Sequence, residues 1–286
     1  AKVKFTCLGI IIIILIGLCY SLMYSEELKV DKQVSEVKKI PSDENWYFTY
    51  LGFSKNDYTG KHVKVGVIDT NIEDDLQKKV KKYVSLTPTV EEEANLHGSK
   101  MLKVLYNVAP SAEVYHYGIS SNDKNVRPSV LVKAFEEALK DNVTIINISL
   151  NFKKEITDLT PLLRKAHEQG VTVISSMGNE GENTVTFPAS SPYTIAVNSI
   201  DEGGTISDYS NYGADVDFSL PGLATIDGEA EEGTSVSAIL LTGMVSRIKE
   251  KNNRNLSSDE IMSILQAMSG NKQKNLISGY GTPKID

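Results

Sequence analysis

The feature that most constrains the fold is an alternation of apolar runs with amphipathic segments, which begins near residue 45. The stretch Val143 to Leu150, VTIINISL, carries no charge, and Lys61 to Ile68 ends in a similar apolar run. Continuous apolar runs are typical of strands buried on both faces, and helical segments between them indicate parallel pairing. We therefore expect an α/β fold: a three-layer, doubly wound, mostly parallel sheet.

The remaining segments follow the same alternation. We expect further strands at 113–119, 171–176, 193–200 and 216–220, and helices from 97 and at 130–139, 161–168, 235–249 and 258–268. In such sheets, binding sites lie at the carboxyl ends of the strands. Small and polar residues follow three of these strands, which predicts a cleft there: Asp69-Thr70, Ser149-Leu150-Asn151 and Gly178-Asn179-Glu180-Gly181.

The N-terminal segment is a candidate membrane segment. Residues 5–24 hold no charged side chain, and twenty helical residues span about 30 Å, the thickness of a bilayer core. Lys2 and Lys4 precede this segment, which predicts that the chain after it lies outside the cytoplasm. An uncleaved anchor, a cleaved signal peptide and a lipid-modified Cys19 remain three interpretations, because only a poor cleavage site follows.

Residues 25–44 are expected to form a solvated stalk, because ten of these twenty side chains are charged with mixed signs. Cys7 and Cys19 both precede the stalk, so the rest of the chain can form no disulfide and no cysteine–metal site. The net charge is −7 and no basic block is present, so we expect no nucleic-acid partner. The domain organisation expected is therefore a segment 1–24, a stalk 25–44 and one domain over 45–286.

Several kinds of chemistry lack their motifs. The chain has no phosphate-binding G-x-x-x-x-G-K-[ST], no G-x-G-x-x-G and no H-E-x-x-H. Its four histidines, His62, His97, His116 and His167, are not spaced as a metal pair. We therefore expect neither nucleotide chemistry nor hydrolysis by a bound metal.

Hydrolysis by an activated serine needs a nucleophile, a base and an acid that orients the base. Ser235 follows Gly233-Thr234 at the start of an expected helix, where backbone N–H groups can serve an oxyanion. His97 begins an amphipathic helix, and Asp69 ends an apolar strand, where an acid is costly without a partner. Alone, each residue has an ordinary explanation: a helix cap for Ser235 and Asp69, and a surface or core position for His97.

The order of the three residues is more specific than any one of them. An α/β-hydrolase needs its histidine after the serine, but no histidine follows Ser235. A chymotrypsin-like enzyme has the order His, Asp, Ser on β-barrels, which the strand–helix alternation excludes. The order Asp69, His97, Ser235 on an α/β sheet is the order of subtilisin.

From about Trp46 to its C-terminus, the chain resembles the subtilisin-like serine proteases, or subtilases. The resemblance is carried by segments in the family's order: Tyr58-Thr59-Gly60 with Val63 to Thr70, His97-Gly98-Ser99, Val108 to Ala112, Asn147 to Leu150, Met177 to Gly181, Phe187-Pro188-Ala189, Ile195-Ala196-Val197, Pro221-Gly222, Gly233 to Ser237 and Gly279-Tyr280-Gly281. It implies a subtilisin-like fold over 45–286.

The resemblance also implies a role for each site residue. Ser235 would attack the scissile carbonyl, His97 would take and return the proton, and Asp69 would orient the imidazole. Asn179 would donate its side-chain amide to the oxyanion. Asn147 to Leu150 resembles an edge strand that pairs with a peptide, and the substrate-binding residues expected are Ser149, Leu150, Asn151 and Gly178.

The chain departs from the family in four places. Ser99 to Lys103 replaces a small, apolar helix turn, so the packing around the triad must differ. Ile239-Leu240 stands where a proline is common, and a proline-free helix needs no kink. Twelve residues separate His97 from Pro110, too few for the usual calcium loop, so we expect no calcium or other cofactor there. Only the stalk stands where secreted relatives carry a prodomain, so we expect folding without a covalent one.

These observations predict a serine endopeptidase, monomeric and extracytoplasmic, either secreted or held at the membrane through residues 5–24. Its partner would be a peptide or protein substrate. The compact domain favours processing of secreted peptides, for which a lantibiotic leader is one candidate. A surface protease of broad specificity and a catalytically dead peptide-binding subtilase are the alternatives.

Overall fold

The computed structural model describes residues 45–55, 57–87, 96–119 and 126–285. The anchor or signal segment and the stalk lie outside these residues. Among the described helices, none is both long and apolar enough to cross a membrane. The prediction for residues 5–24 is therefore not addressed by the structure.

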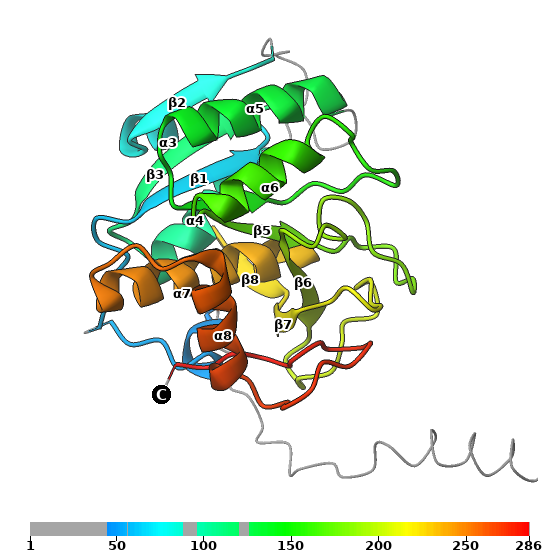
Figure 1. The fold of residues 1–286 in the computed structure, drawn as a ribbon. Helices are drawn as coiled ribbons and strands as arrows, with labels where there is room; N and C mark the ends of the chain where they lie inside the picture. Colours follow the sequence, from blue (N-terminus) through cyan, green and yellow to red (C-terminus); the bar gives the residue numbers. More distant parts are fainter. Residues whose placement is uncertain (1–44, 56, 88–95, 120–125, 286) are drawn as a thin grey trace, which may run out of the picture. The chain divides into compact units, whose positions relative to one another are not determined.

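A seven-stranded sheet forms the middle of the domain, in the order β2-β3-β1-β4-β5-β6-β7 (Figure 1). Every neighbouring pair in it is parallel. The strands are β1 (Lys64–Asp69), β2 (Lys82–Ser85), β3 (Glu113–Gly118), β4 (Ile145–Ile148), β5 (Thr172–Ser176), β6 (Ile195–Ile200) and β7 (Phe218–Pro221).

Helices cover both faces of this sheet and complete the three layers. One face is covered by α5 (Pro128–Lys140) and α6 (Thr160–Glu168). The other face is covered by α4 (His97–Val108), α7 (Thr234–Asn252) and α8 (Ser258–Met268), with the short α2 (Trp46–Tyr50) packed on the same core. The short α3 (Asp74–Lys79) joins β1 to β2.

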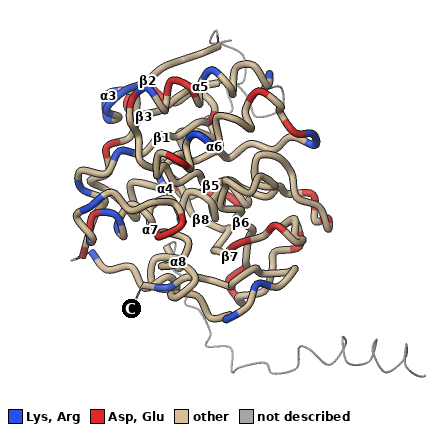
Figure 2. Tube along the Cα trace, in the orientation of Figure 1, with Lys and Arg blue, Asp and Glu red and all other residues tan. Residues whose placement is uncertain are grey.

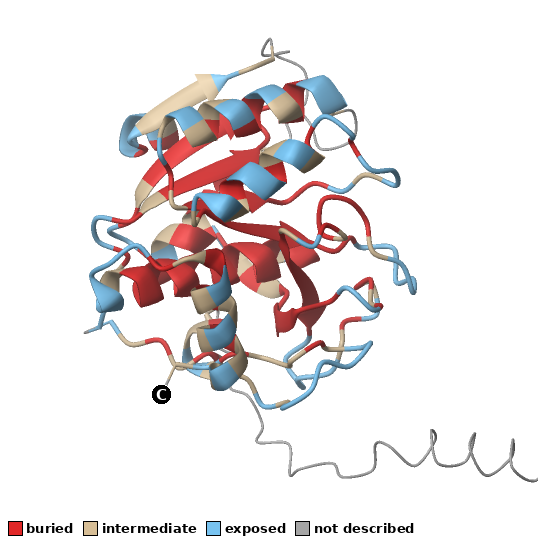
Figure 3. Ribbon diagram, in the orientation of Figure 1, coloured by how far each residue is buried: buried red, intermediate tan, exposed pale blue. Residues whose placement is uncertain are grey.

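The alternation of side chains along each strand produces two cores. Val65 and Val67 of β1 join the core under α4 and α7, while Ile68 joins the core under α5 and α6. Ile145 and Ile146 of β4 divide between the two cores in the same way. Figure 3 shows the inner strands of the sheet and most of α7 as buried. Because strands buried on both faces must be apolar on both, the continuous apolar runs of the sequence follow directly.

The strand order places the site. β3 and β2 lie on one side of β1, and β4 to β7 lie on the other. The direction of winding therefore reverses between β1 and β4, and ligands of doubly wound sheets bind at this reversal, beyond the carboxyl ends of the strands. Asp69 ends β1, and Ser149 follows the last residue of β4.

The three-layer fold predicted from the sequence is confirmed, and the elements expected from it are found with ends shifted by a few residues. The short, charged elements α3 and β2 were not predicted. The antiparallel hairpin of β8 (Leu223–Ile226) and β9 (Glu229–Glu232) was also missed. Its turn, Asp227-Gly228, has positive φ at both residues, as a type I′ hairpin turn requires, and the Asp-Gly pair is a recognised signal for this turn.

One prediction about the strands was wrong. The segment around Asn147 was expected to be an edge strand, but β4 is the fourth of seven strands and pairs with β1 and β5. An apolar strand buried on both faces belongs inside a parallel sheet, where its own hydrogen bonds are used. A peptide can pair only with the residues that continue past the end of β4.

Candidate active site

Asp69 is the buried acid of the site. Its side chain is fully buried at the end of β1, and its Oδ1 accepts hydrogen bonds from the Thr70 backbone N–H and from His97 Nδ1, both at 2.7 Å. A buried carboxylate needs such partners, because losing its hydration is costly. The chain therefore orders Asp69 through the residue that follows it and through the first residue of α4.

His97 is the first residue of α4 and is 13% exposed. Because a carboxylate accepts hydrogen bonds, the short contact with Asp69 places the proton of the neutral ring on Nδ1. Nε2 is then the basic nitrogen. The adjoining Gly98 N–H donates to Thr70 Oγ1 at 2.8 Å, so Thr70 fixes the start of this helix as well as the Asp69 carboxylate.

Ser235 is the second residue of α7 and is 7% exposed. The first turn of a helix has N–H groups without partners in the helix and carries a partial positive charge. An oxyanion that forms next to Ser235 would therefore be stabilised by the helix itself. Ile239 and Leu240 are buried inside α7, which continues past them to Asn252 without interruption.

Thr234 holds the Asn179 side chain in one orientation. The Thr234 N–H and Oγ1–H both donate to Asn179 Oδ1 at 2.9 Å. The Gly178 N–H in turn donates to Thr234 Oγ1 at 3.2 Å. Because the carbonyl end of the Asn179 amide is bound in this way, its NH₂ end is directed away from Thr234 and can serve as a donor.

A pocket of about 320 Å³ brings most of the predicted site residues together. Its lining includes His97, Ser235 and Asn179, together with the three predicted groove residues, and the remaining lining residues are Met101, Glu180, Glu231, Glu232 and Val236. Asp69 lies behind His97, outside this lining. Residues from five separate parts of the sequence therefore meet at the edge of the sheet where the strand order reverses.

The groove segment Ser149-Leu150-Asn151 runs beyond the end of β4 and lines the pocket. Ser149 Oγ–H donates to Asn147 Oδ1 at 3.1 Å, and Thr186 Oγ1–H donates to Asn151 Oδ1 at 2.7 Å. These bonds fix both ends of the segment. It is the part of the chain to which an extended peptide could add as a strand.

Gly178 shapes the pocket from behind and is not among its lining residues. Its φ is +106°, and a Cβ on it would lie 2.5 Å from Asn211 Nδ2 and 2.6 Å from Glu180 Oε2. A larger residue would therefore strain the backbone and displace the segment that carries Asn179.

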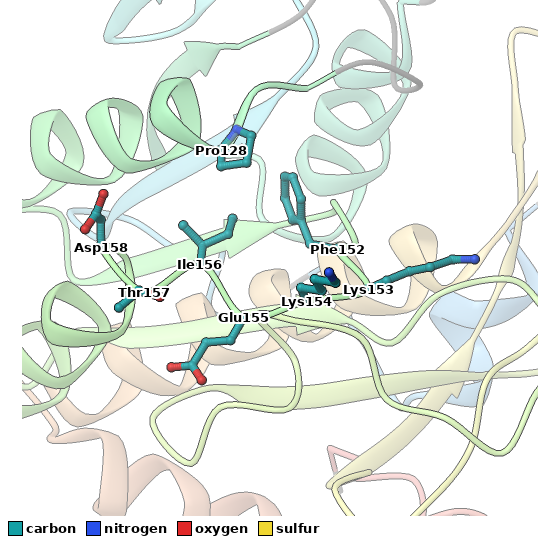
Figure 4. Close-up of a pocket in the computed structure, with 8 residues that line it drawn as sticks. All are labelled: Pro128, Phe152, Lys153, Lys154, Glu155, Ile156, Thr157 and Asp158. Atoms are coloured by element: carbon teal, nitrogen blue, oxygen red, sulfur yellow. The ribbon is translucent and has the colours of Figure 1, made fainter.

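A second pocket of about 540 Å³ begins at Phe152, the residue after the groove segment. Phe152 exchanges two backbone hydrogen bonds with Phe187, at 2.8 and 2.9 Å. Figure 4 shows Pro128 facing Ile156 across this pocket, with Lys153 and Glu155 directed away. The chain that leaves the pocket of His97 and Ser235 thus lines a second pocket with an apolar interior and charged residues at its edge.

The pocket that contains His97 and Ser235 has an acidic wall, formed by Glu180, Glu231 and Glu232. Glu180 Oε2 accepts a hydrogen bond from Asn211 Nδ2 at 2.6 Å, and Glu231 pairs with Lys100 at 2.6 Å. Glu232 also lines an adjoining pocket with Asp201, Glu202 and Asp208, and Figure 2 shows acidic segments around β6 and β7. The charge of this wall is suited to a substrate with basic residues.

The polar residues in the helix turn after His97 each have a structural partner. Ser99 is buried, and its Oγ accepts the Glu73 N–H at 2.8 Å. Lys100 reaches Glu231, and Lys103 reaches Asp227 at 2.6 Å and Glu73 at 3.2 Å. The two lysines therefore bind the β8–β9 hairpin, which leads directly to Ser235.

Thr70 and Thr234 were expected only as parts of sequence motifs. Their hydrogen bonds to Asp69 and Asn179 were not predicted. His116 was also not among the predicted site residues, although it is buried and contacts Thr70. No local pattern marks the contacts of His116 and Thr234, because their partners lie 46 and 55 residues away along the chain. The signal available in the sequence was a threonine directly next to Asp69 and another directly next to Ser235.

Within the described residues, no group of three or more His, Cys, Asp or Glu side chains could hold a metal ion. The expectation that calcium and other cofactors are absent remains a prediction.

Comparison with known proteins places this geometry in a family. Residues 60–281 match the subtilase family, Peptidase S8. The chain belongs to the subtilase family. The matched residues lie inside the predicted domain 45–286, and the resemblance seen in the sequence is thereby confirmed.

Individual subtilases match over most of the domain. The chain is 30% identical to subtilisin E of Bacillus subtilis over 219 residues, which cover 68% of this chain and 57% of that protein. It is 28% identical to subtilisin BL of Lederbergia lenta over 211 residues, which cover 68% of this chain and 78% of that protein. The match thus spans little more than half the length of some curated relatives.

Solved structures share the fold at lower identity. A lanthipeptide protease superposes with a TM-score of 0.70 at 23% identity, covering 79% of this chain and 87% of the other. A mutant of the protease domain of PatA superposes with a TM-score of 0.68 at 18% identity, covering 79% and 94% of the two chains. These similarities establish the subtilisin-like arrangement of the sheet and helices.

Proposed function

We propose that this subtilase is a serine endopeptidase in which Asp69, His97 and Ser235 form the catalytic triad. The observation that carries the proposal is the 2.7 Å contact between His97 Nδ1 and Asp69 Oδ1, with His97, Ser235 and Asn179 lining one pocket. A dead binding protein of this fold would not need an acid buried behind a histidine that faces a serine pocket.

In the proposed reaction, Ser235 Oγ attacks the carbonyl carbon of the scissile peptide and its proton passes to His97 Nε2. Asp69 stabilises the imidazolium through Nδ1–H. The carbonyl oxygen becomes an oxyanion, which accepts hydrogen bonds from Asn179 Nδ2 and the N-terminus of α7. Collapse breaks the C–N bond, and the leaving amine takes the proton from His97. Water then attacks the ester carbonyl on Ser235 while His97 takes a proton from it. Collapse of this second intermediate breaks the bond to Ser235 Oγ, which takes the proton back from His97, and the acid product leaves.

The proposed setting is processing of secreted peptides or proteins outside the cytoplasm, by a monomer that residues 5–24 export or anchor. The acidic wall of Glu180, Glu231 and Glu232 favours substrates with a basic residue near the scissile bond. The resemblance to a lanthipeptide protease in fold makes a lantibiotic-type leader a specific candidate substrate. A surface protease of broad specificity is the alternative.

A fluorophosphonate probe tests the proposed chemistry, because it reacts with an activated serine. We expect the wild type to be labelled and Ser235→Ala to be unlabelled. Ser237→Ala is a matched control, since the Ser237 hydroxyl is buried and donates to Leu220 O. A folded wild type that takes no label would contradict the proposed activity and favour the catalytically dead alternative.

Mass spectrometry of secreted peptides tests the substrate class. Cells with the wild type and cells with Ser235→Ala are compared for peptides that differ by one cleavage. A leader that accumulates uncleaved only in the Ser235→Ala cells supports the processing role. Many unrelated cleavages lost together would favour the broad protease.

A further inference from the structure

A buried histidine, His116, lies directly behind the Asp69–His97 pair and has no part in the reaction proposed above. It is fully buried on β3, where its Cα pairs with Val67 in the parallel ladder to β1. A Cβ added at Gly98 would lie 3.1 Å from the His116 ring, so this ring reaches the start of α4. His116 therefore touches the two elements that carry the acid and the base.

The hydrogen bond of His116 defines its protonation. Nε2 lies 2.8 Å from the Thr70 backbone oxygen, and because a carbonyl only accepts, Nε2 carries the proton. Nδ1 is buried and has no hydrogen-bond partner. Burial also lowers the pKa of His116 from its ordinary value, so the ring is neutral with its single proton on Nε2.

Thr70 carries the effect of His116 into the site. Its backbone N–H donates to Asp69 Oδ1 at 2.7 Å, and its Oγ1 accepts the Gly98 N–H at 2.8 Å. The position of this one residue therefore sets both the Asp69 carboxylate and the first turn of α4, where His97 stands. The bond from His116 anchors the carbonyl of Thr70 from the opposite side.

We propose that His116 is a positioning residue. Its Nε2–H bond to the Thr70 carbonyl holds Thr70 in the place where Asp69 and His97 keep the geometry of their hydrogen bond. This inference rests on the proposed function. The groups that face His116 are Asp69 from β1, Tyr83 from β2, whose ring stacks on it at 6.0 Å, and the Gly98 turn of α4. Asp69 is the charged group among these. Its negative charge raises the pKa of His116, against the lowering by burial.

Two substitutions separate positioning from packing. His116→Leu removes the donor at similar volume, and His116→Gln keeps an N–H donor near the place of Nε2. Val114→Ala, a buried change on the same strand, is the control for loss of packing. Rates are divided by the number of active sites titrated with the fluorophosphonate, so that unfolded protein does not count.

We expect His116→Leu to lower kcat about tenfold with KM within twofold, because a small misplacement of a catalytic group lowers the rate and leaves binding intact. The acid limb of kcat/KM moves to lower pH in this variant, since a misplaced carboxylate stabilises the imidazolium less. His116→Gln recovers most of the rate, and Val114→Ala changes neither kcat per site nor the pH profile. An unchanged kcat and pH profile in folded His116→Leu would overturn the inference.

A measurement on the wild type does not depend on any variant folding. Nitrogen chemical shifts of the imidazole rings report which nitrogen carries the proton. We expect His116 to stay neutral with the proton on Nε2 from pH 5 to pH 8. A charged ring or a proton on Nδ1 in this range refutes the inference, whereas a wild type without phosphonate labelling refutes the proposed function alone.

Discussion

Thr234 shows how a residue next to the proposed nucleophile can act through a neighbour. Its N–H and its hydroxyl both bind the carbonyl end of the Asn179 amide. An amide can rotate by half a turn and present oxygen in place of nitrogen, which would repel an oxyanion. Two donors from Thr234 exclude this arrangement, so Thr234 would supply the orientation for the proposed hydrogen bond from Asn179 to the oxyanion.

Thr234→Val is predicted to lower kcat about tenfold with little change in KM, because the Asn179 amide loses one of its two anchors and samples unproductive orientations. Steady-state kinetics on a peptide substrate measure the effect. Thr234→Ser keeps the hydroxyl and should retain most of the rate. Asn179→Ala removes the donor itself and should lower kcat by about 10²–10³, the loss known for the oxyanion donor of subtilisin. This loss is the upper limit for the effect of a Thr234 variant. A Thr234→Val variant with the wild-type kcat would contradict the role.

At the scale of elements, charge pairs join α4 to the β8–β9 hairpin, and one of them, Lys100–Glu231, reaches the pocket. Lys100 and Glu231 are 38% and 20% exposed, so their pair adds little to stability. Its position matters more, because Glu231 lines the proposed catalytic pocket and Lys100 offsets its charge. The net charge of the pocket wall is therefore set in part by a residue of the helix that His97 begins.

Lys100→Met is predicted to raise the preference for a basic over an acidic residue near the scissile bond, since Glu231 then acts as an uncompensated carboxylate. The ratio of kcat/KM for matched Lys and Glu peptides should rise severalfold at low salt and return toward the wild-type ratio at 1 M salt. Lys103→Met is the control, because its partners Asp227 and Glu73 do not line the pocket. Equal ratios for Lys100→Met and the wild type would show that the pair does not influence selectivity.

The N-terminus of α8 offers a pH-dependent test of a structural element. Ser257 Oγ accepts the Glu260 N–H at 3.2 Å, and Glu260 Oε2 accepts the Ser257 N–H at 2.9 Å, which together form a capping box. The hydrogen bond from Arg254, followed by that from Ser257, lowers the pKa of Glu260 from 4.5 to about 2. Ionised Glu260 thus favours the folded state.

Because its pKa is lower in the folded state, Glu260 contributes stability above its unfolded pKa of 4.5, and this contribution is lost as the pH falls toward 2. Glu260→Gln is therefore predicted to unfold more easily than the wild type at pH 7, with the difference shrinking at pH 3. Urea unfolding at the two pH values measures it. Asp259→Asn, 84% exposed in the same turn, should show a smaller change. A difference that stays constant with pH would exclude this origin.

At the scale of the whole domain, two apolar cores hold the sheet between helices, and both cysteines lie outside the described residues. α4 connects to β3 through a short turn, with Ala109 closing the helix. The segment between them has no room for the calcium loop common in relatives. Stability of this domain is therefore expected to come from packing and hydrogen bonds.

Calcium is predicted to leave the thermal stability almost unchanged. A ligand stabilises only by binding the folded state, and 1 kcal/mol corresponds to about 2–4 °C in Tm for a domain near this size. Melting curves after chelation and after addition of millimolar calcium should differ by less than about 2 °C. Magnesium serves as the control for ionic strength. A large rise specific to calcium would reveal a site that the sequence did not predict.

Much of the fold was predictable because the burial of a strand can be recognised from the residues of the strand itself. Runs such as VTIINISL are apolar on both faces only where both faces are covered, which fixes the three layers. The short β2 and β9 were missed because they are partly exposed and charged, so no apolar period marks them. The position of β4 inside the sheet was misjudged because strand order depends on crossovers, which no local pattern records.

The sequence by itself determined the fold class, the family and the identity of the candidate triad, because these depend on apolar runs, motifs and their order along the chain. The tertiary structure alone decided which side chains hold the site. Thr70, Thr234, Lys100 and His116 act on partners far away in sequence. Such contacts exist only after the sheet and helices have packed, since hydrogen bonds and ion pairs depend on distance in space and not along the chain.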